Sequence, residues 1–364
     1  MKVFLISNMF PSQKDRLFGV FVKNSKEELE KLGVQFNPCV LIKGKSYSAF
    51  HKFFRYLKHY LLIATSFFGG NYELLYVHYL THHLPILLLL VPFKNRPWVI
   101  NVHGSDINAV RKGGVLKFFA SMILKRIDML IVPTSQFRDM VKELFPFIGI
   151  NAIIVSPSGG IDETLFYRSA TATKKSNTIS LGFISRLTEE KGWKIFLEAM
   201  GLLKKEGLQF NALMVGKGED EDIIKATISA MDLQKEVRFL GFVPQEDLVQ
   251  IYSTLDLYIF PTFRDSLGLT GLEAMSCGVP VVASNIKGGP TTYIEHGSNG
   301  FLFPPKDSYG LSRAILHYKG LHISEKKQII DNALKIAKSY RRSEVAKSLK
   351  KNLAAISKKQ ASIT

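Results

Sequence analysis

Apolar positions along this chain come in short, unbroken runs, separated by longer stretches in which apolar residues have a helical spacing. The runs are continuous rather than alternating, which indicates strands buried on both faces. Strands that alternate with helices predict parallel sheets built from βαβ units. The clearest predicted strands are VFLISNMF, ELLYVHY, WVINVHG, DMLIVPTS, AIIVSPSG, TISLGFISR, NALMVGKG, VRFLGF, LYIFPT and VPVVASN.

The predicted strands fall into two groups, one in each half of the chain. At 364 residues the chain is longer than one hydrophobic core usually serves, so two domains are expected. The polar stretch TATKKSNT, residues 171–178, has no large apolar side chain and is the best break between the groups. We therefore predict an α/β fold of two doubly wound, Rossmann-like domains over residues 1–170 and 171–345, followed by a lysine-rich helical tail over residues 346–364.

Polar residues and glycines that interrupt the apolar pattern follow the predicted strands. In open parallel sheets, ligands bind beyond the carboxyl ends of the strands. Two such edges that face each other form an interdomain cleft, which is where we expect the functional site. The residues at these ends are Asn8, His78, His103, Gly159 and Gly160 in the first half, and Arg186, Gly216, Gly218 and Thr262 in the second.

The most specific pattern is PTFRDSLGLTGLEAMSCGVPVVAS, in which a strand is followed by a helix that begins within its SLG segment. Small residues at the helix start leave the amides of Gly268, Leu269 and Thr270 open to an anion. Asp265 precedes the helix and Glu273 lies on its second turn, so two carboxylates are placed to bind hydroxyls at opposite ends of a phosphate-bridged ligand. The alternative is that Asp265 caps the helix and Glu273 is solvated.

A second pattern, GFISRLTEEKGW, places two cations in one strand-to-helix loop. Arg186 and Lys191 suit a diphosphate, because a guanidinium group binds two oxygens at once. The alternative is surface charge balanced by Glu189 and Glu190; the position at a strand's carboxyl end favours the phosphate site. The segment VGKG, which contains Gly216, is a weak signal alone and matches neither the dinucleotide motif nor the P-loop.

The net charge of +17 predicts an acidic partner: nucleic acid, anionic lipid or a phosphorylated substrate. No nucleic-acid-binding signature occurs in the sequence, so nucleic acid is not expected as the partner. Cys39 and Cys277 lie in unrelated contexts and predict free thiols in a reducing compartment, the cytoplasm. The apolar N-terminus predicts a first strand rather than a signal peptide, and LPILLLLVPF is shorter than the about 20 residues that span a bilayer.

One basic stretch of the first half points to a membrane surface. Residues 31–72 contain no acidic residue, and basic and aromatic side chains follow each other there at helical spacing, as in Lys52, Phe53, Arg55 and Lys58. Such a helix can lie in a lipid interface, so we expect an anionic membrane as a partner and a peripheral position on the inner face of the cytoplasmic membrane. The alternative is an ordinary helix with its aromatic side packed inward. A second run of this kind is RKGGVLKFFASMILKR.

With these motifs the chain resembles the retaining glycosyltransferases of family 4, of the type that builds bacterial surface polysaccharides. The resemblance implies a GT-B fold, acceptor binding by the first domain and nucleotide-sugar binding by the second. It also implies transfer, with retained configuration, from a UDP- or GDP-linked sugar to a lipid-linked or other saccharide acceptor, without a further cofactor. It rests on SRLTEEKGW, VGKGED, VRFLGFV, DSLGLTGLEAMSCGVPVVAS and NGFLF, and more weakly on FGVFVKNSKEELEKLGV, VINVHGSD and SPSGGID.

The resemblance implies a role for each matching residue. Arg186 and Lys191 bind the donor diphosphate. Glu273 holds the nucleotide ribose, while Asp265 binds hydroxyls of the transferred sugar and His103 lies at the reacting sugar, near the acceptor. The remaining donor-binding positions are Gly19, in a loop that closes over the phosphates from the first domain, Gly216, and the amides of Gly268, Leu269 and Thr270.

Three positions depart from the family pattern. Asp265 is one methylene shorter than the usual glutamate, which leaves the sugar preference open. Phe18 precedes Gly19 where two adjacent glycines are common, and Thr292 stands where the family often has glutamate. None of these changes removes the phosphate-binding cations or Glu273.

The histidines of the first half allow two interpretations. A lone histidine after a buried strand is often structural, but in VHGSD the following Asp106 is expected to orient the ring of His103. His78, His82 and His83 lack nearby carboxylates or cysteines, so we expect no metal. The leaving diphosphate is then neutralised by the two cations and the helix N-terminus.

The nearest rival function is a sugar-nucleotide epimerase on the same fold. Such an enzyme needs acid and base groups around the sugar and no acceptor groove. Incubation with the donor alone separates the two, because an epimerase forms an epimer whereas a transferase gives only slow hydrolysis.

Overall fold

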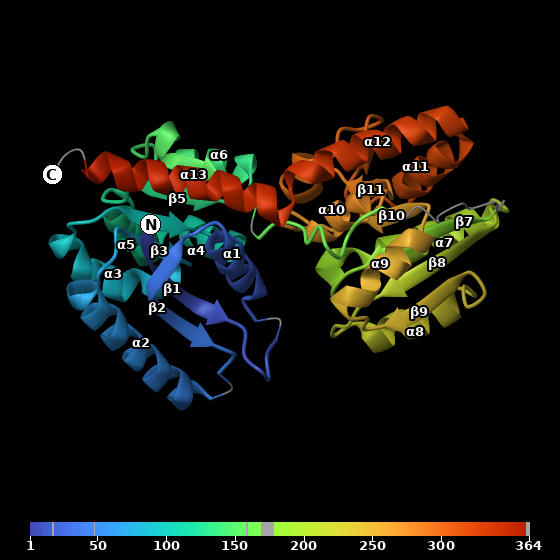
Figure 1. The fold of residues 1–364 in the computed structure, drawn as a ribbon. Coiled ribbons are helices and arrows are strands. Elements are labelled where there is room, and N and C mark those ends of the chain that lie inside the picture. Colours follow the sequence, from blue (N-terminus) through green and yellow to red (C-terminus); the bar gives the residue numbers. More distant parts are fainter. Residues whose placement is uncertain (17, 47, 158, 169–177, 362–364) are drawn as a thin grey trace. The chain divides into compact units, whose positions relative to one another are not determined.

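The computed structural model describes residues 1–16, 18–46, 48–157, 159–168 and 178–361 (Figure 1). Contacts divide the chain into two units: unit 1 contains Met1–Gly160 together with the C-terminal segment from Arg342, and unit 2 contains Ile161–Arg341. These divisions differ from the boundaries at 170 and 345 that the sequence suggested. Most of the polar stretch 171–178, expected to be the break between domains, lies outside the described residues.

Unit 1 is built on a six-stranded parallel sheet with the strand order β2-β1-β3-β4-β5-β6. The register places Leu5 of β1 beside Tyr76 of β3 on one side and Cys39 of β2 on the other. Four of the six strands are covered on both faces, as their continuous apolar runs predict. The strands are β1 (Lys2–Phe10), β2 (Gln35–Lys43), β3 (Leu74–His78), β4 (Trp98–Asn101), β5 (Met129–Val132) and β6 (Ile153–Val155).

Helices cover both faces of this sheet. Alternate residues of each strand enter two separate cores, since Phe4 and Ile6 point to one face and Val3 and Leu5 to the other. The first core is closed by α2 (Ala49–Gly69), α3 (Leu84–Leu90), α4 (Gly104–Arg111), α5 (Gly114–Leu124) and α6 (Ser135–Leu144). The second core is closed by α1 (Val20–Lys31) and α13 (Arg342–Ala361).

The C-terminal helix α13 is part of unit 1, although all of unit 2, Ile161–Arg341, precedes it in the chain. Leu349 and Leu353 are buried in the core beside Leu29 of α1, and the Lys350 ammonium donates to the Leu32 carbonyl over 2.7 Å. Figure 1 shows this helix, in red, running along unit 1. Residues 346–361 of the predicted tail lie in this helix, and its apolar side completes the core of unit 1.

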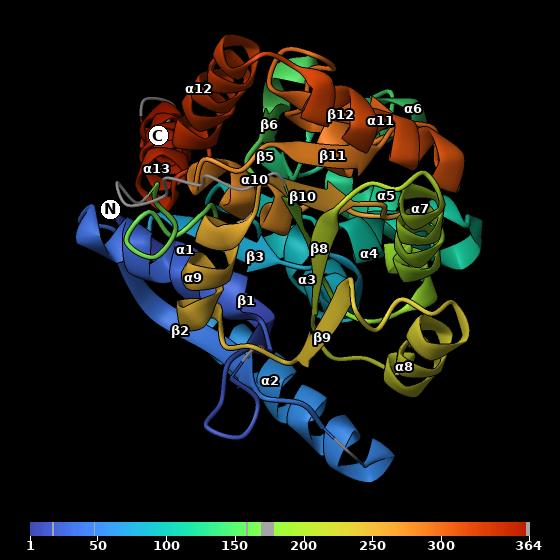
Figure 2. The same cartoon turned by 90° about the vertical axis from the view of Figure 1, so that its right-hand side faces the viewer.

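Unit 2 repeats the plan with a parallel sheet of order β12-β11-β10-β7-β8-β9. Helices α7, α8 and α11 cover one face, while α9, α10 and α12 cover the other; Figure 2 shows α7 and α9 on opposite sides of β8. The strands are β7 (Ile179–Ile184), β8 (Phe210–Val215), β9 (Val237–Gly241), β10 (Leu257–Phe260), β11 (Val281–Ser284) and β12 (Gly300–Phe303). The helices are α7 (Trp193–Lys205), α8 (Glu221–Ala230), α9 (Gln245–Thr254), α10 (Leu269–Ser276), α11 (Ser308–Gly320) and α12 (Ile323–Ser339).

The prediction of two doubly wound parallel sheets is confirmed. Ten of the strands were expected, whereas β2 and β12 were not. Both are edge strands, and β2 contains Pro38 and alternates between exposed and buried positions. A proline is tolerated at a sheet edge, so the pattern there lacks the continuous apolar run of a central strand. Among the described helices, none combines the length and apolar character needed to cross a bilayer.

Candidate functional site

The sheet order of unit 2 brings three of its predicted loops together. The chain leaves β7 toward β8 and β9 on one side, and then returns to β10 on the other side of β7. Such a switch point is where doubly wound sheets bind ligands. Arg186 and Lys191 follow β7, Gly216 follows β8, and Asp265 follows β10, so these residues stand at the carboxyl ends of three adjacent strands.

Lys191 and Asp265 form an ion pair across the switch point. The Lys191 ammonium lies 2.9 Å from Asp265 Oδ2 and also donates to the Arg264 carbonyl over 3.2 Å. The lysine side chain is 11% exposed and the aspartate side chain 23%. Partial burial reduces screening by water, so this pair is stronger than a surface pair. The predicted phosphate-binding cation and the predicted sugar-binding carboxylate are thus direct partners.

Two loops are tied together beneath this pair. The Phe263 amide donates to the Glu190 carbonyl over 2.8 Å, and the buried Thr262 hydroxyl is 3.3 Å from the same oxygen. Lys191 ends the 3₁₀ helix η4 (Glu189–Lys191), and a side chain at Gly192, which has φ 75°, would overlap the Pro261 carbonyl. Close backbone packing therefore holds Lys191 against the β10 loop.

The first turn of α10 has open backbone amides. Gly268 precedes the helix with φ 80°, and the Tyr293 hydroxyl donates to its carbonyl over 2.9 Å. Within the described part of the chain, no hydrogen-bond acceptor is present for the amides of Gly268, Leu269 and Thr270. These amides, with the positive end of the helix dipole, form an anion-binding arrangement. The residue before the helix is Gly268, so the alternative that Asp265 caps α10 is wrong.

Glu273 is buried on the second turn of α10, at 6% exposure. The Gln245 amide donates to Glu273 Oε1 over 3.1 Å, and the Tyr252 hydroxyl lies 3.3 Å from Oε2. Burial, together with the charge of this carboxylate, holds the pKa of Tyr252 well above its usual value. The alternative that Glu273 is an ordinary solvated residue is therefore wrong, because a buried carboxylate needs such partners.

Arg186 is the most open of the predicted cations. Its side chain is 67% exposed and lies 3.9 Å from Glu190. An exposed pair at this distance contributes little to stability, so the guanidinium is available to an incoming ligand. Gly216, after β8, has φ 147°, and a side chain there would overlap the Ser185 carbonyl next to Arg186. Glycine at this position lets the β7 and β8 loops approach each other.

Unit 1 has its own switch point, between β1 and β3. Gly19 precedes α1 with φ 71°, and a Cβ atom there would lie only 2.5 Å from the carbonyl carbon of Met9. Only glycine lets the start of α1 lie against the end of β1 in this way. Asn8, near the end of β1, is buried, and its side-chain amide donates to the Tyr56 hydroxyl over 3.2 Å.

His103 lies next to His78 at the ends of β4 and β3. The rings are stacked with centroids 5.5 Å apart, and His103 Nε2 is 3.3 Å from His78 Nδ1. Phe21 and Tyr79 pack on His103 with ring centroids at 4.8 and 4.5 Å. Burial lowers the pKa of His103 to about 3. The imidazole is therefore neutral at physiological pH.

The Asp106 carboxylate bonds to backbone amides and not to the His103 ring, contrary to the expectation from the VHGSD segment; the two residues meet through the capping box of α4. Its carboxylate accepts hydrogen bonds from three backbone amides: His103 over 2.7 Å, Leu80 over 3.0 Å and Ile107 over 3.1 Å. Burial raises the pKa of Asp106 to about 7, and the amide hydrogen bonds oppose this shift. The residue caps α4 and ties it to the β3 loop, while the neighbouring aromatic rings and His78 position the His103 ring.

Two further histidines of unit 1, His59 and His83, also form a buried pair. His83 Nδ1 is 2.6 Å from the Tyr79 carbonyl, so it donates, and His83 Nε2 lies 3.1 Å from His59 Nε2. Burial lowers the pKa of His59 to about 3 and that of His83 to about 4. Among the described residues, no group of three or more histidines, cysteines, aspartates and glutamates is arranged to hold a metal ion.

The basic stretch expected at a membrane forms α2, and its residues have different roles. Lys52, Phe53 and Lys58 are exposed. Arg55 instead folds back: its guanidinium donates to the carbonyls of residues 43, 44 and 45 and to the Ser46 hydroxyl, over 2.6–3.1 Å. The assignment of Arg55 to a membrane or acceptor surface is therefore not supported by its geometry, since this side chain holds the preceding loop.

Sequence reasoning missed the side chains that support the predicted residues. Gln245, Tyr252 and Tyr293 come from α9 and from the segment after η5 (Gly289–Thr292), and none stands in a recognisable motif. Tyr258 of β10 was counted only as a strand residue, although its hydroxyl donates to the Ile184 carbonyl over 2.8 Å and lies 2.9 Å from the Thr270 hydroxyl.

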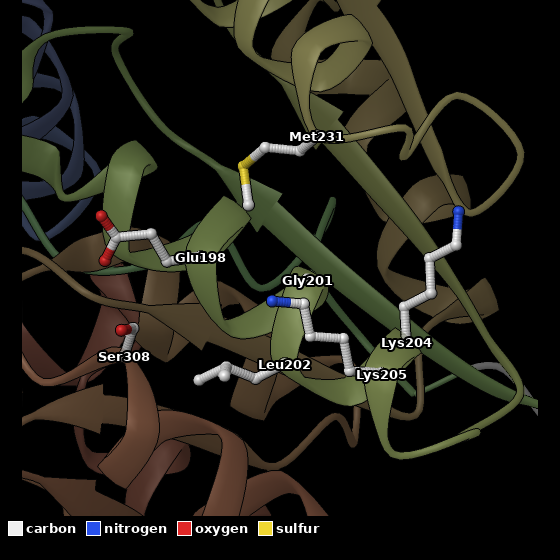
Figure 3. Close-up of a pocket in the computed structure, with 7 residues that line it drawn as sticks. All are labelled: Glu198, Gly201, Leu202, Lys204, Lys205, Met231 and Ser308. Atoms are coloured by element: carbon white, nitrogen blue, oxygen red, sulfur yellow. The ribbon is translucent and has the colours of Figure 1, made fainter.

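One groove of unit 2 lies away from these loops (Figure 3). It has a volume of about 710 Å³ and is formed mainly by the C-terminal half of α7. Figure 3 shows side chains of α7 around it, none of them a predicted site residue. Its Lys204 is engaged by Asp232 and Glu236. The lining residues are Glu198, Gly201, Leu202, Lys204, Lys205, Met231 and Ser308.

A comparison with known protein families matches the part of the chain that contains the loops described for unit 2. The model of the family described as glycosyl transferases group 1 matches residues 168–342. The amylovoran biosynthesis glycosyltransferase AmsK of Erwinia amylovora is 33% identical over 139 residues, which is 36% of this chain and 34% of that protein. The D-inositol 3-phosphate glycosyltransferase of Corynebacterium jeikeium is 28% identical over 66% of this chain and 62% of its own length. The chain thus spans less than two thirds of either curated relative.

The fold is shared over nearly the whole chain. The Anabaena protein Alr3699/HepE, solved in complex with UDP-glucose, superposes with a TM-score of 0.70 at 20% identity, covering 97% of this chain and 99% of that one. Two six-stranded parallel sheets with helices on both faces make this a GT-B fold. The family match thus covers residues 168–342, and the shared fold extends over nearly the whole chain.

Proposed function

We propose that this protein is a retaining glycosyltransferase that moves a sugar from a nucleotide-diphosphate sugar to a lipid-linked saccharide acceptor, in the synthesis of a surface polysaccharide or glycolipid. The observation that carries the donor assignment is the group formed by the open first turn of α10, the buried Glu273 and the Lys191–Asp265 pair. The names of the relatives support the reaction class, since one serves amylovoran synthesis and a GT-B neighbour was solved with UDP-glucose.

The proposed donor site places positive charge and open amides next to the diphosphate, where negative charge develops as it leaves. Arg186 and Lys191 bind the diphosphate, and the amides of Gly268, Leu269 and Thr270 meet its oxygens or those of the sugar. Preorganised cations and amides of this kind stabilise a departing anion because they need no rearrangement during reaction. Gly216 keeps the loop after β8 close to Arg186, and Gly19 places the corresponding loop of unit 1.

The ion pair and the buried carboxylate are proposed to bind different parts of the donor. A diphosphate attracts Lys191 away from Asp265, which frees the Asp265 carboxylate to accept hydrogen bonds from hydroxyls of the transferred sugar. Glu273 already has Gln245 and Tyr252 as partners, and a carboxylate held in this way can accept bonds from both ribose hydroxyls. The uncharged His103 contacts the reacting sugar as a neutral hydrogen-bonding group.

Retention of configuration is proposed to occur with the donor itself as base. An oxygen of the departing phosphate takes the proton of the acceptor hydroxyl, while that hydroxyl forms the new bond on the face the phosphate leaves. His103 is a poor base for taking this proton, because burial lowers its pKa to about 3. Its proposed contribution is therefore to position the sugar.

The test is a binding panel followed by a product analysis. Thermal unfolding of the full chain is measured with UDP-, GDP- and ADP-sugars, because a ligand at 100 times its dissociation constant stabilises by about 2.7 kcal/mol. One nucleotide class is expected to stabilise the wild type and not Lys191→Ala. The preferred donor is then incubated alone; slow release of free sugar supports a transferase, whereas formation of an epimer, or stabilisation by no nucleotide, contradicts the proposal.

A further inference from the structure

Helix α2 is apolar on two opposite sides. His59, Ile63 and Phe67 face the core and are buried. At about 100° per residue, a second set at spacings of three, four and seven lies on the opposite side of the helix. This outer stripe is exposed, with Phe50 at 74% and Leu61 at 60%. Its members are Phe50, Phe54, Leu57, Leu61 and Phe68.

Helix α5 carries a matching outer stripe. Val115, Phe118, Phe119 and Met122 follow the spacing i, i+3, i+4, i+7, and all four are exposed, Phe118 at 64%. The inner side of α5 is held in the core by residues such as Ile123. The two stripes are unlike the apolar residues exposed on unit 2, which come singly from different elements; scattered residues of that kind need no explanation, whereas contiguous ones do.

The two stripes belong to one surface. Helices α2, α3 and α5 close the same core on the same face of the sheet, and α3 packs against both of its neighbours (Figure 1). Leu89 of α3 is exposed, and Phe93 of the 3₁₀ helix η2 (Val91–Phe93) contacts Phe68 with ring centroids 5.5 Å apart. We call this the α2–α5 face: the outer stripes of α2 and α5 with Leu89 and Phe93 between them.

Charge on the α2–α5 face has one sign. Residues 31–127 contain only two acidic residues, Glu73 and Asp106. Asp106 is buried in its amide contacts, and Glu73 accepts from the Lys2 amide and from Ser357 of α13, on the other face of the sheet. Lysines and arginines stand at both ends of α5 and on α2. The exposed ones are Lys52, Lys58, Arg111, Lys112, Lys125 and Arg126.

We infer that the α2–α5 face binds an anionic lipid bilayer, with α2 and α5 lying along the interface. An outer row of Phe, Leu, Val and Met flanked by lysine and arginine fits the border between acyl chains and negatively charged headgroups. A second copy of this chain fits less well, because a two-fold interface would place the same lysines and arginines against each other without a carboxylate between them. The inference extends the proposed function by giving the lipid-linked acceptor a surface on which the enzyme meets it.

The apolar half is tested with the triple variant Leu57→Ser, Leu61→Ser and Phe118→Ser. These side chains are exposed, so the fold should be retained, and melting temperature and circular dichroism verify this. The matched control is Ile223→Ser with Ile323→Ser, exposed apolar residues of α8 and α12 in unit 2. Full-length protein is co-sedimented with vesicles of phosphatidylglycerol and phosphatidylcholine. We expect the triple variant to lose the binding that persists in high salt, and the control to keep it.

The charged half is tested with Lys52→Glu and Lys58→Glu, matched by Lys327→Glu and Lys335→Glu on α12. Each lysine near an anionic surface contributes about fivefold to partitioning, so the α2 pair should bind phosphatidylglycerol vesicles on the order of thirtyfold more weakly at low salt. Binding to pure phosphatidylcholine should change little. Arg55→Ala is not used, because its loss would release the loop of residues 43–46.

Three results overturn the inference: no vesicle binding by the wild type, equal binding by the variants and their controls, or concentration-dependent self-association that only the triple variant abolishes. The last result assigns the α2–α5 face to a second copy of the chain. Nucleotide binding is measured in parallel on every variant. The altered residues lie outside the proposed donor loops. Loss of vesicle binding with intact nucleotide binding therefore supports the membrane surface alone. If none of the proteins binds a nucleotide, that result refutes the proposed function, separately from the membrane surface.

Discussion

The two units share one architecture and differ in what stands at the ends of their central strands. In unit 2, the loops after β7 and β10 carry a partly buried ion pair, Lys191 with Asp265, and a buried carboxylate, Glu273. In unit 1, the loops after β3 and β4 carry stacked imidazoles, His78 and His103, packed among aromatic rings. The same topology therefore supports a strongly charged site in one unit and a neutral one in the other.

This difference has a physical consequence for which part of a substrate each unit can hold. A diphosphate needs fixed positive charge and open amides, and unit 2 provides both. A sugar hydroxyl can also be bound by donors and acceptors without net charge, which neutral imidazoles provide. The outer surfaces also differ, since unit 1 exposes contiguous apolar stripes and the described residues of unit 2 show none. Four predictions test this division, from the largest expected effect to the smallest.

Removing the cation from the unit 2 ion pair should have the largest effect. Lys191→Ala is expected to lower the rate of nucleoside-diphosphate release from the preferred donor about 10²–10³-fold, because the developing charge loses a preorganised partner. Initial rates with labelled donor measure this. Lys194→Ala, an exposed lysine of α7, is the control and should act like wild type. A Lys191→Ala rate within a few fold of the wild type would contradict the assignment.

The second largest effect is expected on nucleotide affinity, when the buried carboxylate of Glu273 is replaced. Glu273→Gln keeps the shape of the side chain and replaces charged acceptors by a neutral amide, so we expect UDP or GDP to bind about 10–100-fold more weakly. Titration calorimetry with the nucleoside diphosphate measures this change. Glu246→Gln, an exposed position in the first turn of α9, should change nothing. If only acceptor use declined, Glu273 would belong to a different substrate.

Acid should destabilise unit 1 more than unit 2. The folded-state pKa values of His59, about 3, and His83, about 4, lie below the unfolded value of about 6.5. Groups with lowered pKa values contribute stability above pH 6.5, and this contribution is lost as the pH falls from 6.5 toward 4. By pH 5 the loss reaches up to about 2 kcal/mol per histidine.

Each unit has one tryptophan, which lets the acid effect be followed separately. Trp98 lies in β4 of unit 1 and Trp193 begins α7 of unit 2. Fluorescence melts of Trp193→Phe and Trp98→Phe between pH 7.5 and 4.5 should show the Trp98 transition moving to lower temperature first. A double variant, His59→Phe with His83→Leu, should show a smaller acid-induced shift of the Trp98 transition. An earlier acid transition at Trp193 would reverse the comparison.

The smallest effect concerns two arginines. Arg55 of unit 1 donates to backbone carbonyls of the loop before α2, and Arg55→Ala should lower the free energy of unfolding by about 1–3 kcal/mol. Arg186 of unit 2 is exposed, and Arg186→Ala should change it by less than about 0.5 kcal/mol. Only the second variant should weaken nucleotide binding. Urea unfolding and nucleotide titration separate the two, and equal destabilisation would remove the distinction.

Local patterns along the chain determined much of the fold and part of the site. Continuous apolar runs identified ten of the strands, because a strand buried on both faces shows its environment in its own residues. The position of Gly268 and the small residues around it predicted the open start of α10, since glycine conformation and helix initiation are local properties. Edge strand β2, by contrast, is half exposed and carries no such pattern.

The tertiary structure decided which of these local features become partners. Lys191 and Asp265 are 74 residues apart in the chain, and Gln245 and Glu273 are 28 apart; sheet order brings each pair together. Asp106 appeared placed to orient a histidine three residues away, but burial makes it satisfy backbone amides first. Arg55 was predicted to face a membrane, yet its guanidinium donates to carbonyls of the loop before α2. The pattern of apolar residues along the chain predicts which positions are buried. It does not predict the partner of a buried charge or a hydrogen-bonded cation, because that partner comes from a distant segment that packs against it in the folded structure.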